Sequence, residues 1–249
     1  MTPTMTETRT LVLLHAFPLG ARMWAPQQSA FPGWRLITPA LPGFDDSHAS
    51  ASSMDAFAAH VNQELDRLEI VSAVIGGLSL GGYVAFGVLR QRPERVSALI
   101  LADTRSGADG DQAREGRLRM LKVLEEHGPS GVFAEMRPKL FGATTYANRL
   151  AVVEQAKGLA ESQTSAAIEG AIRAMLDRPD STPMLGTIVV PTLIVVGEED
   201  VMTPPAESEG MRAAIPRATL VRLPHAGHLS NLETPEAFNE AVSAFLSTL

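Results

Sequence analysis

The sequence contains no cysteine in its 249 residues, which excludes disulfide bonds, thiolate metal sites and a cysteine nucleophile. It has no apolar run long enough to cross a bilayer, and residues 1–10 show no basic segment followed by an apolar stretch. The net charge is −7, and the chain contains no basic block. Nucleic acid and anionic membranes are therefore disfavoured as partners. We therefore expect a cytoplasmic protein that binds neither nucleic acid nor membrane.

Hydrophobic residues make up 45% of the chain, which is enough for a sizeable core and indicates one large α/β domain or a core with one insertion. Apolar, β-branched runs predict buried strands, and between them apolar residues recur at helical spacing, as in residues 54–68 after a possible N-cap at Ser53. The predicted strands lie at 10–14, 35–39, around 74–75, and at 96–102, 192–196 and 218–223. Alternating strands and helices predict a mostly parallel sheet with helices on both faces.

Strands disappear between about residues 104 and 186, where only helical patterns occur. Leu118, Leu121 and Leu124 form one such pattern, and Ile168 and Ile172 begin another. We therefore divide the chain into a core of residues 1–103 and 187–249 and a helical insertion of residues 104–186.

A glycine-flanked serine lies where the apolar run around residue 75 meets the following helical pattern. The segment Gly77-Leu78-Ser79-Leu80-Gly81 has the pattern GxSxG, which is typical of a nucleophilic serine at a sharp strand-to-helix turn. A glycine-rich turn alone would explain the glycines without requiring the serine. A catalytic serine additionally requires a later acid, a later histidine and an earlier loop of backbone N–H donors.

Polar residues follow the carboxyl ends of several predicted strands: His15, Ser79, Asp103, Asp200 and His228. In parallel sheets this edge is where ligands bind. Unrelated surface loops would not bring these residue types to one edge. We therefore expect the functional site there.

Four segments together resemble the α/β-hydrolase family, in its carboxylesterase and enol-lactonase-like branch. His15-Ala16-Phe17-Pro18 resembles the family's oxyanion loop, Gly77–Gly81 its nucleophile elbow, Gly197-Glu198-Glu199-Asp200 its acid loop, and Gly227-His228 with Glu233 and Pro235 its histidine loop. The order serine, acid, histidine is also the family's order. The resemblance implies the α/β-hydrolase fold, with the insertion as a helical cap over the nucleophile.

The resemblance implies a catalytic triad of Ser79, Asp200 and His228, in which the histidine accepts the serine proton and the acid orients the histidine. Asp103 remains an alternative acid, because some family members carry the acid after the preceding strand. His15 is expected to support the oxyanion loop.

Backbone N–H groups of Phe17 and Leu80 are the expected oxyanion donors. Ala16 stands where the family usually has glycine. If that position required a positive φ, the alanine would be strained and the role of Phe17 would be in doubt.

An apolar stripe in the insertion consists of Phe133, Met136, Leu140 and Phe141. It either lines the acyl or alcohol pocket or packs the cap against the core.

No metal-ligand cluster is visible, and the chemistry requires no cofactor. We expect an esterase for small carboxylic esters that forms an acyl-enzyme. A lactonase of the enol-lactone type, a C–C bond hydrolase and a non-catalytic small-molecule receptor stay open, as does the oligomeric state.

Overall fold

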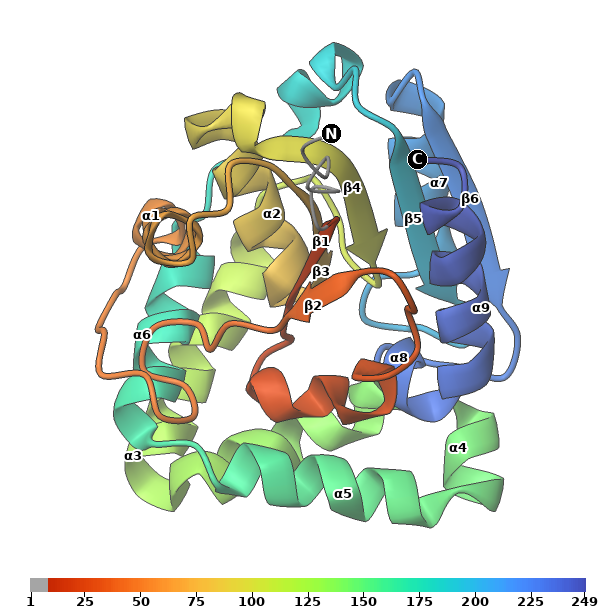
Figure 1. Cartoon of the computed structure of the whole chain (residues 1–249). Coiled ribbons are helices and arrows are strands. Elements are labelled where there is room, and N and C mark those ends of the chain that lie inside the picture. Colours follow the sequence, from red (N-terminus) through yellow and green to blue (C-terminus); the bar gives the residue numbers. More distant parts are fainter. Residues whose placement is uncertain (1–8) are drawn as a thin grey trace, which may run out of the picture.

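The computed structural model describes residues 9–249, which fold around a six-stranded sheet (Figure 1). The strand order is β2-β1-β3-β4-β5-β6, and each neighbouring pair is parallel. The strands are β1 (Thr10–Leu14), β2 (Arg35–Ile37), β3 (Ala73–Leu78), β4 (Val96–Ala102), β5 (Thr192–Gly197) and β6 (Ala218–Leu223). The described sheet is thus parallel throughout, and the predicted α/β fold is confirmed.

Burial explains the sequence pattern of the strands. Every residue of β1, β3 and β5 is buried, as expected for strands covered by helices on both faces. The two edge strands differ, since β2 has only three residues and β6 is mostly half-buried or exposed. Short or polar edges limit pairing with other chains.

Helices of the core lie on either side of the sheet in Figure 1, with α1 and α2 on one side and α9 on the other. Their bounds are α1 (Met54–Arg67), α2 (Leu80–Gln91), α7 (Pro205–Ala214), α8 (Ser230–Glu233) and α9 (Pro235–Leu246), with 3₁₀ helices η1 (Ala21–Gln27) and η2 (Pro93–Arg95). The predicted N-cap is confirmed, because the Ser53 hydroxyl accepts the N–H of Ala56 at 3.2 Å.

The insertion consists of α3 (Asp111–Leu140), α4 (Ala143–Asn148), α5 (Leu150–Glu161) and α6 (Ser165–Leu176), followed by η3 (Thr182–Thr187). α3 is kinked at Gly128, which has φ 64°. In Figure 1, α3, α4 and α5 lie across the end of the sheet toward which the strands point. We call residues 104–186 the cap; these boundaries stay a prediction. No helix within residues 9–249 is long and apolar enough to span a membrane.

The segments that enter and leave the cap are joined by a buried carboxylate. Asp109 accepts hydrogen bonds from Arg105 at 2.6 Å, Arg117 at 3.1 Å and Arg178 at 3.0 Å. Burial alone would raise the pKa of Asp109, but the three guanidinium groups outweigh it and the pKa is lowered. We call these four residues the Asp109 cluster; it ties the chain after β4 to α3 and to the chain after α6.

Candidate active site

Ser79 occupies the corner between β3 and α2, with φ 55° and ψ −111°. Such a conformation costs on the order of 1–3 kcal/mol in a residue with a side chain and persists only where its surroundings hold it. Its backbone hydrogen bonds do so, among them the bond from the Ser79 N–H to Ala102 O at 2.9 Å and the bond from the Thr104 hydroxyl to Ser79 O at 2.9 Å. The predicted strand-to-helix turn is therefore present.

The flanking glycines are required by close packing and not by their backbone angles, since neither has a positive φ. A Cβ on Gly77 would lie 2.1 Å from the carbonyl of Gly81, and one on Gly81 would lie 2.1 Å from the carbonyl oxygen of Leu14. The start of α2 thus presses against the end of β1. This contact brings the elbow next to the loop that contains Phe17.

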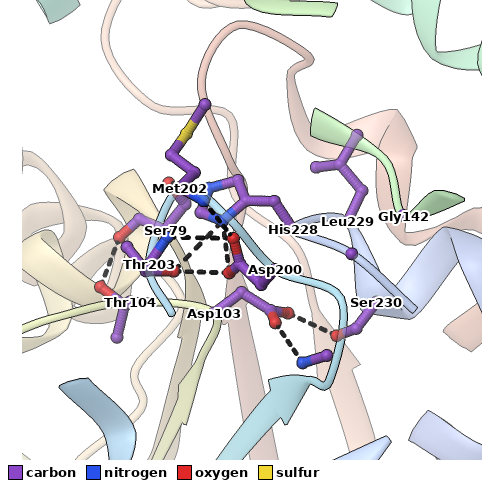
Figure 2. Close-up of polar contacts among 12 residues, drawn as sticks. Ser79, Asp103, Thr104, Gly142, Asp200, Met202, Thr203, His228, Leu229 and Ser230 are labelled. Atoms are coloured by element: carbon purple, nitrogen blue, oxygen red, sulfur yellow. Dashed lines mark hydrogen bonds and ion pairs between the residues drawn. The ribbon is translucent and has the colours of Figure 1, made fainter. Parts of the chain in front are cut away.

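Ser79, His228 and Asp200 form a continuous chain of hydrogen bonds (Figure 2). His228 Nε2 lies 2.8 Å from Ser79 Oγ, and His228 Nδ1 lies 2.8 Å from Asp200 Oδ2. All three side chains are buried, and Ser79 is the most exposed of them at 8%. The serine hydroxyl proton has a direct path to the imidazole.

Asp200 receives further hydrogen bonds from its own loop. Its Oδ1 accepts the N–H groups of Met202 at 2.8 Å and Thr203 at 3.0 Å, and its Oδ2 accepts the Thr203 hydroxyl at 2.6 Å. Burial would raise the pKa of Asp200, but His228 and Thr203 outweigh it, so the pKa is lowered. An ionised carboxylate only accepts, so the Nδ1 of His228 carries the proton and Nε2 is free to accept one.

Asp103 lies near the triad but makes no hydrogen bond to His228 (Figure 2). It accepts the N–H of Gly197 at 2.8 Å and the hydroxyl of Ser230. Complete burial and the neighbouring charge of Asp200 raise its pKa well above the usual value, in spite of those hydrogen bonds. Of the two acids weighed from the sequence, the structure brings Asp200 to the histidine.

The other histidines of the described chain make no hydrogen bond to Ser79. His15 is fully buried, accepts the N–H of Leu41 on Nε2 at 3.1 Å and lies 3.1 Å from Ala16 O through Nδ1. Burial lowers its pKa to about 4, so it is neutral near pH 7. It joins the loop after β1 to the loop around residue 41, which fits the supporting role predicted for it.

The two expected oxyanion donors are free to bind a ligand. Within residues 9–249, neither the N–H of Phe17 nor that of Leu80 has an acceptor. Ala16 does not have a positive φ, so the strain considered for it is absent; the positive φ in this loop, 84°, belongs to Gly20. Ala16 instead donates its N–H to the sulfur of Met23 at 3.1 Å. Phe17 and Leu80 remain our predicted oxyanion donors.

The apolar stripe of the insertion is buried. Phe133, Met136 and Leu140 lie on the second half of α3, Phe141 follows it, and none is more than 6% exposed. The ring of Phe141 packs edge-on against Tyr146, with centroids 5.9 Å apart. The pocket assignment of these four residues stays a prediction.

No group of three or more His, Asp or Glu side chains suited to a metal ion occurs in the described part of the chain.

Sequence reasoning missed three hydroxyl groups around the triad. Thr104 bonds the Ser79 carbonyl, Thr203 bonds Asp200, and Ser230 bonds Asp103. Thr203 stands with Pro204 in the segment after Asp200 that resembles the family's acid loop, and Thr104 follows a strand end that resembles that of the lactonases. Neither resemblance, nor the position of Ser230, shows which group the hydroxyl binds, because the partners are set by tertiary structure.

Comparison with known proteins agrees with this geometry. The chain is 33% identical over 187 residues to a putative carbamate hydrolase, RutD, of Pseudomonas syringae pv. syringae, covering 74% of this chain and 71% of that protein. It is 29% identical over 198 residues to 3-oxoadipate enol-lactonase 2 of Acinetobacter baylyi, covering 78% and 70%. A solved structure of a thermophilic esterase from Thermogutta terrifontis, with malate bound, superposes with a TM-score of 0.93 at 35% identity, covering 96% of this chain and 90% of that one.

The family comparison extends over nearly the whole chain. The alpha/beta hydrolase family matches residues 11–241, a range that contains the helical insertion and most of both parts of the core. The match therefore includes the elbow, the acid loop and the histidine loop. Together with the hydrogen-bonded serine, histidine and aspartate, it shows that this chain belongs to the alpha/beta hydrolase family.

Proposed function

We propose that the protein is a serine hydrolase that cleaves small carboxylic esters through an acyl-enzyme. The observation that carries this proposal is the hydrogen-bonded chain Ser79–His228–Asp200 at the carboxyl edge of the sheet. The 35% sequence identity between this protein and the Thermogutta terrifontis esterase supports ester hydrolysis in particular. In this proposal Ser79 is the nucleophile, His228 the general base and Asp200 the acid.

Acylation begins at Ser79 Oγ. Its proton moves to His228 Nε2 as Oγ attacks the ester carbonyl carbon, and the carbonyl π electrons move onto oxygen. The N–H groups of Phe17 and Leu80 stabilise that oxyanion, and Asp200 stabilises the imidazolium. The C–O bond to the alcohol then breaks, and the alcohol leaves with the proton from Nε2.

Deacylation repeats these steps with water. Water gives a proton to His228 Nε2 while its oxygen attacks the acyl carbon, and the ester bond to Ser79 Oγ breaks. The serine recovers its proton from the imidazolium, and the carboxylic acid is released. Each cycle consumes one water and leaves the protein unchanged, so these residues account for the reaction without an added cofactor.

The cap limits the acyl group in this proposal. We place the acyl chain against the stripe Phe133, Met136, Leu140 and Phe141, which is apolar and buried. Each added methylene then contributes about 0.8 kcal/mol until the pocket is filled. Longer chains clash with the cap, so activity rises and then falls within short acyl chains.

The test is kcat/KM for p-nitrophenyl acetate, butyrate, octanoate and palmitate, measured with a chelator and beside an enol-lactone. We expect a maximum at a short acyl chain and no effect of the chelator. A preference for palmitate or a requirement for metal would reject the proposal. No turnover of any substrate, with no labelling by a fluorophosphonate, would favour a non-catalytic receptor.

A lactonase is the second candidate, because the chain is 29% identical to the Acinetobacter baylyi enol-lactonase. The same triad opens a cyclic ester, and the leaving alcohol stays attached to the acyl group. A lactone hydrolysed orders of magnitude faster than every ester would select this candidate. A C–C bond hydrolase would instead cleave a carbon–carbon bond beside a carbonyl faster than it hydrolyses any ester or lactone.

A further inference from the structure

Glu233 is a buried carboxylate that lies five residues after His228 and belongs to α8. It is 1% exposed and makes no hydrogen bond to Ser79, His228 or Asp200 side chains. Burying a carboxylate is costly unless it is well hydrogen-bonded, so its partners indicate what it stabilises.

One oxygen of Glu233 holds the backbone on both sides of His228. Its Oε1 accepts the N–H of Gly227 at 2.9 Å and the N–H of Leu229 at 3.1 Å. The imidazole therefore extends from a residue whose two neighbours are bonded to the same atom. Movement of this oxygen would move the backbone that carries the imidazole.

The other oxygen of Glu233 holds the cap. Its Oε2 accepts the N–H of Gly142 at 2.8 Å, immediately before α4. Figure 2 shows Gly142 close to Leu229 of the histidine loop. The contact leaves no spare room, since a Cβ on Gly227 would lie 2.2 Å from the nitrogen of Gly142. One carboxylate thus joins the cap to the loop of the general base.

Arg149 reinforces this junction from the cap. Its guanidinium donates to the carbonyl oxygen of Glu233 at 2.6 Å and to the hydroxyl of Thr145 at 3.1 Å. Burial raises the pKa of the Glu233 carboxyl, and the hydrogen bonds from Thr145 and from the three backbone N–H groups oppose that rise. These donors stabilise the charged form of a carboxylate placed between two parts of the chain.

We propose that Glu233 is a positioning residue that sets the His228 imidazole relative to Ser79 and couples that position to the seating of the cap. The proposal rests on the proposed function, because it assigns His228 the role of general base. Glu233 itself touches neither substrate nor the reacting atoms. It acts through the amides of Gly227 and Leu229.

Glu199 provides a matched control. Its carboxylate also binds the start of α4, accepting the N–H of Thr144 at 2.8 Å and the Thr144 hydroxyl at 2.5 Å. Its side chain does not bond the amides beside His228. Glu199→Gln therefore perturbs the same junction of core and cap without touching the clamp on the histidine. If Glu233 only anchors the cap, Glu233→Gln and Glu199→Gln should behave alike.

The experiment measures kcat and KM for p-nitrophenyl butyrate, per folded molecule, and the ¹H NMR signal of the Nδ1 proton of His228. Glu233→Gln replaces one acceptor oxygen by an amide donor. We expect kcat to fall roughly 10- to 100-fold, as when catalytic groups are displaced by about 1 Å. The Nδ1 proton signal should shift or broaden. Glu199→Gln should keep the signal and change mainly KM.

Glu233→Asp is the second variant, since it keeps the charge and both oxygens if the glutamine variant does not fold. We expect the same signature with a smaller amplitude. An unchanged Nδ1 signal with wild-type kcat in either folded variant would overturn the proposal, as would equal losses in Glu233→Gln and Glu199→Gln. The NMR arm requires no turnover, so it separates this result from failure of the proposed function, which would show as an inactive, unlabelled wild type.

Discussion

The catalytic edge of the core and the cap are held by different kinds of interaction. At the catalytic edge, buried backbone groups and short side chains fix the site, as in the bonds of Ser79 to Ala102 and Thr104. The cap is tied down by long charged side chains, above all in the Asp109 cluster. In our proposal the core supplies the reacting groups, and the cap limits which substrate reaches them.

The largest effect is expected when the nucleophile at the catalytic edge is removed. Ser79→Ala should lower kcat on the order of 10⁶-fold, as in other triads from which the nucleophile is removed. Stability should change little or rise, since the hydroxyl contributes one hydrogen bond on a strained residue. Ester hydrolysis and thermal unfolding measure the two effects. Ser162→Ala, at an exposed serine, is the control, and full activity in Ser79→Ala would contradict the mechanism.

The next largest effect is expected at the catalytic edge, where the buried acids Asp200 and Asp103 should differ in their importance for kcat. Asp200→Asn should lower kcat on the order of 10⁴-fold, because the amide no longer fixes the protonated Nδ1 of His228. Asp103→Asn should do much less, since Asp103 makes no hydrogen bond to the histidine and its pKa is already raised. Steady-state kinetics on one ester compare them. A reversal of the two losses would move the acid to Asp103.

The cap is tested through the Asp109 cluster. Asp109→Ala leaves Arg178 with a buried side chain, 2% exposed, and no carboxylate partner, which should cost about 3–5 kcal/mol of unfolding free energy. Asp177→Ala is the matched control, since its ion pair with Arg114 is largely exposed and contributes about 0–1 kcal/mol. Urea unfolding measures both.

Kinetics distinguish the cap from the core in the same variants. In Asp109→Ala, KM should rise while kcat of the folded enzyme stays within a few fold of wild type. A large loss of kcat with unchanged KM would show that the cap contributes directly to the chemistry, against the division drawn here.

The smallest effect is expected from His15, a residue of the core, on the pH dependence of the free energy of unfolding. Burial lowers its pKa from 6.5 to about 4, so below pH 6.5 the unfolded chain takes up a proton that the folded protein does not. The contribution of neutral His15 to the free energy of unfolding is therefore complete above pH 6.5. It is lost as the pH falls to about 4, which lowers the free energy of unfolding by about 3 kcal/mol. Urea unfolding across this range should lose that slope in His15→Gln and keep it in His127→Gln, at an exposed histidine. Equal slopes in wild type and His15→Gln would contradict this assignment.

Much of the core was predictable because its signals are local. The apolar runs of β1, β3, β4 and β5 follow from burial, and the glycines around Ser79 stand in a short pattern that is recognisable in the sequence. The alternation of these runs with helices then predicted the parallel sheet. The carboxyl edge, and so the region of the site, followed from that topology.

The parts that were not predictable depend on contacts between distant residues. The choice between Asp103 and Asp200 required the distances to His228, because both acids follow buried strands. The roles of Glu233 and Thr104 depend on partners that the sequence does not place beside them. Ala16 looked unfavourable only because the sequence does not reveal its φ.

The central claim is that Ser79 is acylated during turnover. The most direct measurement is peptide mass spectrometry of the protein quenched in acid during the first turnovers of p-nitrophenyl butyrate. We predict one added butyryl group on the peptide that contains Ser79, formed together with a burst of p-nitrophenol and absent in Ser79→Ala. A butyryl group on another residue, or turnover without any acylated peptide under conditions where deacylation limits the rate, would contradict the account.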